Sequence, residues 1–487
     1  MIQAKSHRPA GSTKALVLGL LLAALMAAGR TLAPRPAHAA ETFTVDSNLD
    51  RADLNVGDGV CDGLFGQGNH CTLRAAIEEA NASPGKDRIN FNIGGDTGVK
   101  TIAMIEGLPE ITDSVVIDGY SQPGAEPNSL LFGNDAVLKI EISGSGAGPV
   151  DGLLIRSDNV EVRGLVINRF FFDGIDIKGG RTGKKIEGNY IGTDASGTLD
   201  RGNGGSGVLL ASSGNFLGGN DADAPNLIAF NGRDGVQVTE GGNPGSRILR
   251  NSIFSNDDLG IDLGNDGPTP NDDQDRDSGP NGLQNTPEIT SATISGGQTT
   301  VAGELDSAPG KLYVIEFFSN DPGNDEGKKF LGNEVVTTDA NGAADFSDVT
   351  NLAAPVGQSV TATATDSTIG DTSEFSAPVE VEQATAPPPN TAPTITNLSP
   401  APGSRTRDAS PTIRAKVSDR ETDLSRSGIE LSLDGKAVTG FSYNASTDRL
   451  SFTSKKLKKG KHAVKLKATD TPGRSTTRSF SFEVVAR

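Results

Sequence analysis

Hydrophobic and polar residues alternate in short runs along much of the chain, and five of these runs share one pattern. Each has a turn residue, then a glycine, then a strand with apolar residues at every second position. The five are "DGLLI" (151–155), "DGIDI" (173–177), "SGVLL" (206–210), "DGVQV" (234–238) and "LGIDL" (259–263). Alternation with period two predicts short β-strands that each bury one face.

A second type of strand lies between these runs and ends in asparagine or glycine, as in "VEVRGLVINRF" and "SRILRNSIFSN". The glycines of neighbouring runs are 22 to 33 residues apart. Repeats of this length with two or three short strands cannot bury a face alone, so they must stack on one another. The pattern therefore predicts a parallel β-helix. A β-propeller is the alternative, although its blades need longer and more even repeats of four antiparallel strands.

One segment near the start, "CTLRAAIEEAN" (71–81), has helical periodicity instead, with Thr72 as the expected N-cap. Its apolar stripe contains Leu73, Ala76, Ile77 and Ala80. The open end of a stack of repeats exposes its core and its strand edges. We therefore expect this helix to cover the first repeat.

The first residues have the three parts of a secretory signal peptide: basic residues, the apolar run "KALVLGLLLAALMAAG" (14–29) and an Ala-x-Ala cleavage site. Residues 1–40 are therefore predicted to be removed on export, and no later run is apolar enough to span a membrane. An oxidising compartment allows Cys61 and Cys71 to form a disulfide. The alternative is two buried free thiols.

The segment from Phe43 to Ala82, which ends in "CTLRAAIEEANA", resembles the CSLREA domain of secreted bacterial proteins and departs from the namesake hexapeptide at Thr72 and Ala75. Residues 115–125 and 260–289 resemble segments of right-handed parallel β-helix proteins that carry this domain. The resemblance implies a right-handed β-helix in a protein that is secreted or lies at the cell surface of a bacterium. It implies no settled activity and no catalytic motif.

Past Ile289 the pattern changes to longer alternating strands between glycine-rich turns, which is typical of antiparallel sandwiches. A proline-rich, extended linker follows, and the strands after it resemble bacterial Ig-like modules. The predicted fold is all-β: a right-handed parallel β-helix with a short N-terminal capping helix, followed by two antiparallel Ig-like β-sandwich domains. The predicted boundaries are a signal peptide at 1–40, a CSLREA-like cap at 41–95, the β-helix at 96–284, a β-sandwich at 285–382, the linker at 383–393 and a basic Ig-like sandwich at 394–487.

Charge is distributed unevenly along the chain. The formal net charge is -18, yet the segment from residue 394 onward has more basic than acidic residues. An acidic body argues against nucleic acid and anionic membranes as partners, and it is suited to calcium.

The basic counterpart is "KKLKKGKHAVKLK" (455–467), which a hairpin would place with five lysines at its tip. These lysines are Lys455, Lys456, Lys458, Lys459 and Lys461. They are candidates for binding an anionic polymer such as wall polymer, lipopolysaccharide or extracellular DNA. The alternative is a solvated edge that lysines protect from strand pairing. Aromatic residues, which single-stranded nucleic acid would need, are missing from this segment.

Histidine chemistry is nearly excluded, because His7 and His38 belong to the predicted signal peptide and only His70 and His462 remain. Ser-His-Asp triads and histidine-based metal centres are therefore not expected. Carboxylates are the remaining chemical groups.

Stacked repeats bring equivalent positions about 4.8 Å apart. Asp151, Asp173 and Asp234 each precede a repeat glycine, so we expect them in an interrupted row, with Asp176 pointing outward from its strand. Asp173, Asp176 and Asp234 are therefore catalytic candidates. Paired carboxylates would serve glycoside hydrolysis, and carboxylate-bound calcium beside a basic residue would serve elimination from uronates. The basic residues available are Arg163, Arg169 and Lys185. The simpler interpretation is that each turn aspartate caps its own loop and that Asp176 is solvated.

The strongest ionic signal is "NDDQDRDSGPNG" (271–282). Asp273, Asp275 and Asp277 are spaced by two, so alternating side chains of a loop could converge on one calcium ion. The EF-hand pattern is not met, because Ser278 stands where that motif needs glycine. The alternative is a soluble acidic turn, and in either case the position favours a structural joint.

These observations favour an exported, non-catalytic β-helix scaffold for surface attachment or glycan binding, with an extracellular or cell-envelope polysaccharide as its partner. One alternative is a polysaccharide lyase or glycoside hydrolase that acts on the β-helix face. A second is a purely structural cell-surface or matrix protein. Few aromatic residues are present for sugar stacking, and no acid–base pair stands out, so the enzyme is less favoured.

Overall fold

A computed structural model describes most of the chain. The described residues are 40–63, 70–95, 97–179, 182–239, 245–385, 389–421 and 424–486. The predicted signal peptide lies outside them, apart from Ala40. The chain forms two compact units, Met1–Ala384 and Thr385–Arg487. Nearly all regular structure is β, as predicted, and in the described ranges no helix is long and apolar enough to cross a membrane.

Three parallel sheets make up the first part of the first unit. The first sheet contains β1 (Thr42–Val45), β2 (Asp87–Phe91), β4 (Val115–Asp118), β7 (Glu161–Arg163), β10 (Lys184–Glu187), β13 (Asn215–Gly218) and β16 (Arg247–Leu249). The second contains β3 (Lys100–Ala103), β5 (Ile140–Ser143), β8 (Leu165–Asn168), β11 (Tyr190–Ile191), β14 (Leu227–Ala229) and β17 (Ser252–Phe254). The third contains β6 (Leu153–Ile155), β9 (Ile175–Lys178), β12 (Val208–Ala211), β15 (Val236–Val238) and β18 (Ile261–Leu263).

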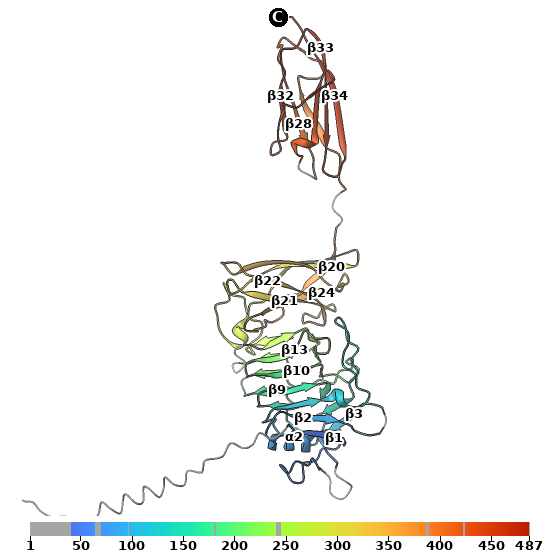
Figure 1. Ribbon diagram of the computed structural model, residues 1–487, viewed down its shortest axis with the longest axis vertical. Helices are drawn as coiled ribbons and strands as arrows, with labels where there is room; N and C mark the ends of the chain where they lie inside the picture. The colour runs from blue at the N-terminus through green and yellow to red at the C-terminus, as the bar shows by residue number, and fades with distance from the viewer. Residues whose placement is uncertain are drawn as a thin grey trace, which may run out of the picture. The chain divides into compact units, whose positions relative to one another are not determined.

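From β4 to β18, every three successive strands add one strand to each sheet, and we call such a group a repeat unit. Figure 1 shows the strands stacked one above another. The register aligns Ile155, Ile177, Leu210, Val238 and Leu263 in one column of the third sheet, and all five are fully buried. Each buried aliphatic side chain contributes about 1.5–3 kcal/mol of transfer free energy, so such columns hold the stack together.

Asparagines that follow the strands also align between repeat units. The Asn203 amide donates to Asn231 Oδ1, and the Asn231 amide donates to Asn256 Oδ1, each at 2.9 Å. All three side chains are shielded from solvent, so each amide needs a partner within the protein. The recurrent asparagine in the sequence is therefore explained by a hydrogen-bonded ladder inside the stack.

The predicted helix is α2 (Leu73–Ala82), and the Thr72 side chain caps it by accepting the Ala75 N–H at 3.1 Å. Its apolar stripe is buried in the core that the parallel strands share. The helix contacts β1 and β2, and β1 is the edge strand of the first sheet (Figure 1). The expected helix, its N-cap and its buried stripe are thus confirmed, at the first edge of the stack.

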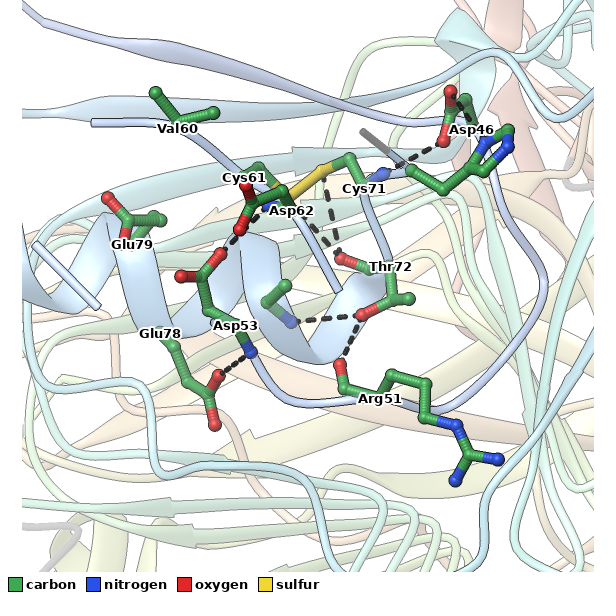
Figure 2. The surroundings of a disulfide bond; sticks show 12 residues. Asp46, Arg51, Asp53, Val60, Cys61, Asp62, Cys71, Thr72, Glu78 and Glu79 are labelled. Atoms are coloured by element: carbon green, nitrogen blue, oxygen red, sulfur yellow. Dashed lines mark hydrogen bonds and ion pairs between the residues drawn. A yellow bond between two sulfur atoms is a disulfide. The ribbon is translucent and has the colours of Figure 1, made fainter. Parts of the chain in front are cut away.

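The predicted disulfide is confirmed: Cys61 and Cys71 are bonded, with their Cα atoms 5.0 Å apart. It ties the segment before α2 to the start of the helix, and Figure 2 shows acidic side chains along the same segment. The backbone N–H of Asp53 donates to Glu78 at 2.6 Å, and that of Gly59 donates to Glu79 at 2.9 Å. The segment is therefore clamped onto α2 by one covalent bond and several hydrogen bonds.

Removing this disulfide should destabilise the first unit moderately. The bond closes a loop with a sequence separation of 10 residues. In the chain-entropy model, a double Cys61→Ser/Cys71→Ser variant loses about 2–3 kcal/mol of unfolding free energy. Urea unfolding of the variant and the parent chain measures this loss, and the reduced parent chain serves as the control. Equal stability of variant and parent would show that the hydrogen bonds alone fix the segment.

The second part of the first unit is a seven-stranded sheet. In spatial order it contains β22 (Lys329–Thr337), β21 (Leu312–Asn320), β24 (Ser359–Asp366), β25 (Val379–Gln383), β19 (Glu288–Ser295), β20 (Gln298–Asp306) and β23 (Ala343–Val349). Its pairs are antiparallel except β19 with β25, and β25 joins the two halves into one sheet. The alternating pattern predicts an antiparallel sandwich here, and the parallel β19–β25 pair departs from it.

This sheet covers the end of the parallel stack with acidic side chains. β16, β17 and β18 are the last strands of their sheets, so their outer backbone N–H groups need acceptors from another element. Four carboxylates accept N–H groups in or beside these strands. Glu374 accepts from Leu263 in β18, and Glu316, Glu326 and Asp371 accept from Arg250, Asn256 and Gly245, which flank β16 and β17. Both parts of the unit are thereby joined through buried polar contacts.

The second unit consists of two sheets around one apolar core. One sheet contains β26 (Thr394–Ser399), β28 (Thr412–Ser418), β32 (Arg449–Thr453) and β31 (Ser442–Asn444). The other contains β27 (Arg405–Thr406), β34 (Ser475–Val484), β33 (Gly460–Thr469), β29 (Ile429–Leu433) and β30 (Lys436–Val438). Pairing is antiparallel except between β27 and β34.

Candidate functional site

A cleft of about 1410 Å³ lies along the connections that lead from the second parallel sheet to the third. Its lining comes from the β5–β6, β8–β9, β11–β12 and β14–β15 connections and from β9 and β15. The cleft therefore runs across several repeat units. The charged and aromatic residues that line it are Asp151, Asp173, Arg169, Lys178, Arg233 and Phe170 to Phe172. We call it the repeat cleft.

The turn aspartates do form the expected row, but each caps the turn of the next repeat unit and not its own loop. Asp151 Oδ1 accepts the N–H of Asp173 at 3.0 Å, and Asp173 Oδ1 accepts the N–H of Ser206 at 2.8 Å. Asp234 Oδ1 likewise accepts the N–H of Leu259 at 3.1 Å. The row is interrupted at Ser206, which has no carboxylate, so Asp151 and Asp173 are neighbours and Asp234 stands apart.

Asp176 on β9 joins the first two aspartates. One ligand oxygen from each of Asp151, Asp173 and Asp176 lies within 4.8 Å of the others. The Asp176 side chain is fully buried, so the prediction of a solvated strand position is wrong. It forms an ion pair with Lys178 through Oδ2, and its Oδ1 has no partner in the described part of the chain. Asp151, Asp173 and Lys178 thus line one corner of the repeat cleft, and the buried Asp176 lies directly behind them.

Burial sets the protonation of this corner. Burial, helped by the neighbouring Asp151 and opposed by the Ser206 N–H, raises the pKa of Asp173 to about 6. Burial also raises the pKa of Asp176, against the opposing effect of Lys178. A carboxyl that can carry a proton near pH 6 beside other carboxylates is the arrangement that general acid catalysis uses.

Two exposed phenylalanines flank the same cleft. Phe171 is 63% exposed and Phe172 is 46% exposed. Their rings meet edge to face with centroids 5.0 Å apart. The low aromatic content of the chain as a whole hides this local pair. The signal that could have found them is three consecutive phenylalanines directly before the turn aspartate of a repeat, where a core strand has already ended.

Basic residues line the cleft beside the aromatic pair. Arg169 contacts Ser143 Oγ at 3.3 Å and Glu141 at 3.8 Å, and Arg233 is exposed. Of the three basic residues expected near the carboxylates, Arg169 alone lies in this cleft. Arg163 on β7 binds Asp118 at 2.8 Å, and Lys185 on β10 lies 3.6 Å from Glu187, both on the first sheet.

Glycines keep the floor of the cleft open. Gly205 is the clearest example, since a Cβ there would lie 2.3 Å from Asp173 Oδ1 and also meet the Phe172 backbone. Any side chain at this position would displace the carboxylate or fill the cleft.

Asp234 lies in a separate, smaller pocket with Asp258 and Asp262. Burial together with the neighbouring Asp262 raises its pKa to about 6, as for Asp173. Among the described residues, no basic side chain lines this pocket. Asp262 accepts the backbone N–H of Asn265 at 2.8 Å, which is a local turn contact. Asp234 is therefore not brought together with Asp173 and Asp176.

The acidic loop after β18 is arranged differently from the expected set. Asp275 and Asp277 gather with Asp272, whereas Asp273 is exposed and pairs with Arg276 at 2.9 Å. Both Asp275 oxygens are already used, by the Asn285 N–H at 3.0 Å and by the Ser307 hydroxyl at 2.8 Å. These contacts tie the loop to the start of the seven-stranded sheet, which fits a structural joint.

The five candidate lysines between Lys455 and Lys461 (the tail lysines) are exposed, but they do not form the tip of a hairpin. They lie in and after the connection between β32 and β33, which belong to different sheets. His462 at the start of β33 holds this connection, because its ring contacts the Lys458 carbonyl at 2.8 Å and Asp434 at 2.7 Å. The lysines therefore lie on a connection that leads from one sheet of the second unit to the other.

Neither a protein-family model nor a curated protein matches the sequence. Solved structures match in part: CopC from Methylosinus trichosporium OB3b, at 19% identity over 20% of this chain and 95% of that chain, has a TM-score of 0.17. Fibronectin(III)-like modules of Clostridium thermocellum CbhA, at 18% identity over 41% of this chain and 94% of that chain, have a TM-score of 0.16. The endo-beta-1,4-mannanase of Thermotoga petrophila, at 15% identity over 20% of each chain, has a TM-score of 0.17. At these TM-scores the likenesses carry no argument about this chain.

Proposed function

We propose that this protein is an exported parallel β-helix scaffold that binds a polysaccharide in the repeat cleft. The observation that carries the proposal is the meeting of exposed Phe171 and Phe172 with carboxylates and cations along one open cleft. Sugar rings present C–H groups that pack on aromatic faces. Their hydroxyls donate hydrogen bonds to carboxylates and accept them from guanidinium groups. A cleft that crosses several repeat units suits a chain of sugars better than a single small molecule.

The β-helix interpretation rests on the order of the strands. Successive strands enter three parallel sheets in turn, and columns of aliphatic residues and asparagines run between repeat units. A right-handed path is what the CSLREA-like segment implies and what parallel crossovers almost always follow. In the same proposal, the two sheets of the second unit form an Ig-like spacer.

Export is supported by the signal-peptide pattern at the start and by the Cys61–Cys71 disulfide, which forms and persists in oxidising compartments. A secreted or cell-surface protein of a bacterium would meet extracellular or cell-envelope polysaccharide. The exposed tail lysines would then add an electrostatic contact to an anionic polymer. Salt would weaken this contact by screening the charges.

Glycoside hydrolysis is a second candidate, favoured by one observation. One oxygen of Asp151 lies within 4.8 Å of one of Asp173, and burial raises the pKa of Asp173 to about 6, so this carboxyl can carry a proton near that pH. Retaining hydrolases hold two such carboxyl groups about 5 Å apart. If cleavage occurs, Asp173 would be the general acid and Asp151 the nucleophile. A purely structural surface role would leave the cleft without a ligand.

Truncating the aromatic pair should weaken polysaccharide binding. Phe171→Ala and Phe172→Ala each remove a stacking surface, and a loss of about 1 kcal/mol corresponds to roughly fivefold weaker binding. Affinity electrophoresis of the whole chain through gels that contain neutral or acidic polysaccharides measures this, with Leu131→Ala as the matched control. Leu131 is also 63% exposed, and it lies outside the cleft.

Three outcomes separate the candidate functions. Retardation by one polysaccharide that both phenylalanine variants reduce and Leu131→Ala does not would support binding in the cleft. Retardation unchanged in all variants would place the binding surface elsewhere. New reducing ends that disappear in Asp173→Asn would establish hydrolysis and make the non-catalytic scaffold wrong.

A further inference from the structure

We propose that Asp151, Asp173 and Asp176 form a binding site for one divalent cation, and that calcium is the cation that fits it. One oxygen from each residue lies within 4.8 Å of the other two. Calcium binds carboxylate oxygens at about 2.3–2.6 Å, so two oxygens on opposite sides of the ion are about 5 Å apart. Magnesium needs shorter distances of about 2.0–2.1 Å and a near-ideal octahedron, which a cluster on a rigid turn supplies less readily.

An unsatisfied buried oxygen points to a missing ligand. The Asp176 side chain has no exposed surface, and its Oδ1 lacks any partner among the described residues. A buried carboxylate oxygen without a donor is costly, and native proteins normally satisfy such atoms. Lys178 compensates the other oxygen of the same carboxylate. A cation on Oδ1 would complete the contacts that the fold leaves open.

The other two carboxylates are held with one oxygen available. Asp151 and Asp173 each use Oδ1 to accept a backbone N–H from the next repeat unit. These contacts fix both side chains before any ligand binds, which lowers the cost of assembling a site. Both residues line the repeat cleft, so a cation could enter from solvent and keep water or another oxygen ligand on its open side.

The three carboxylates coincide at one repeat unit because of the register. In the third sheet, the position of Asp176 is occupied by Leu154 on one neighbouring strand and by Leu209 on the other. The turn position of Asp173 is occupied by Ser206 in the next unit. The strand aspartate and two consecutive turn aspartates therefore meet at β9, and the neighbouring units lack one or both.

The acidic loop that contains Asp275 is a weaker candidate for a cation. Both oxygens of Asp275 already accept hydrogen bonds, and Asp277 is exposed. No oxygen of that loop is among the buried atoms without a partner that the described residues contain. The two acidic clusters can be separated by substitution, because they share no residue.

The site is tested by titrating calcium into the whole chain after chelator treatment. Isothermal titration calorimetry measures the binding, and no polysaccharide is present. We expect one site with a dissociation constant on the order of 10⁻⁴–10⁻³ M, the range of extracellular modules. Asp176→Asn should weaken it at least tenfold, since one charged ligand is lost. The matched control is Asp234→Asn, which changes a turn aspartate with the same backbone contact outside the cluster. Magnesium should bind more weakly than calcium.

Two further variants keep the test decisive. Asp151→Asn retains a side-chain oxygen that can cap the next turn, so it should fold and still lose calcium affinity even if Asp176→Asn does not fold. Asp275→Asn should leave the titration unchanged. Calcium binding that is lost in Asp275→Asn and kept in Asp151→Asn would move the ion to the loop and overturn the proposal. Absence of binding to the parent chain up to roughly 10 mM calcium, well above the range for extracellular modules, would also overturn it. Since no glycan is present, either result leaves the polysaccharide proposal to its own test.

Discussion

Replacing Arg74 with methionine is expected to lower the unfolding free energy of the first unit by about 3–5 kcal/mol, the cost of breaking a buried ion pair from one side. Arg74 on α2 donates to both oxygens of Asp50, at 2.7 and 3.0 Å, and both side chains are almost fully buried. It also donates to the Gly107 carbonyl at 2.7 Å. The variant would leave the Asp50 charge buried without its partner. Urea unfolding of the whole chain measures the loss.

Two controls show whether the ion pair is the cause. Arg51→Met removes an exposed arginine from the same segment and should change stability by less than about 0.5 kcal/mol. Adding Asp50→Asn to Arg74→Met removes the unpaired charge, so the double variant should recover part of the loss. A single Arg74→Met variant as stable as the parent would show that solvent reaches Asp50 and that the pair is not structural.

The arginine of the CSLREA-like segment therefore has a physical reason to be present. Arg74 joins three parts of the chain: Asp50 before the disulfide, α2 itself and the loop at Gly107. The sequence pattern predicted the helix and its apolar stripe, because amphipathic spacing is local. It did not predict that Arg74 and Glu79 would be buried, because their partners come from loops whose path depends on the whole fold.

The strands were predictable for the same local reason, and the cleft was not. Alternation within "DGIDI" and its relatives fixes which residues face the core, and Ile175 and Ile177 are indeed buried. Which residues become neighbours across repeats depends on register, and the spacing between repeats varies. Asp176 was therefore expected to be solvated, although register places it between Leu154 and Leu209.

The joint between the parallel stack and the seven-stranded sheet was the least predictable part. In the sequence, Glu316 is a single charged residue inside an apolar strand and Glu326 lies in the turn-like segment "NDEG", and neither position identifies a buried acceptor. In the structure both are buried and accept N–H groups of the last repeat unit. An edge of parallel strands needs acceptors, and that need is visible only once the sheets are assembled.

This joint should make the first unit less stable at alkaline pH. Burial raises the pKa of Glu316 and of Glu326 to about 7, from an ordinary value near 4.5 in the unfolded chain. A carboxyl whose pKa is raised on folding contributes stability that is fully present below about pH 4.5 and is lost as pH rises through about 7. Between pH 5 and pH 8 each group should remove roughly 2–3 kcal/mol from the unfolding free energy. Urea unfolding at constant ionic strength, at pH 5, 6.5 and 8, measures the change.

The direction of this change does not depend on the two glutamates alone, since burial also raises the pKa of Asp173, Asp234 and Asp275 to about 6. Stability should therefore fall most steeply between about pH 5 and 6.5, where all five groups contribute, and the smaller fall that continues above pH 6.5 is assigned to the joint. Glu316→Gln and Glu326→Gln test that assignment, because each amide keeps an acceptor oxygen but cannot ionise. Each variant should flatten the pH dependence between 6.5 and 8, whatever its absolute stability. A parent chain whose unfolding free energy is constant or rises from pH 5 to pH 8 would mean that both glutamates are ionised in the fold, held by the N–H groups of Arg250 and Asn256.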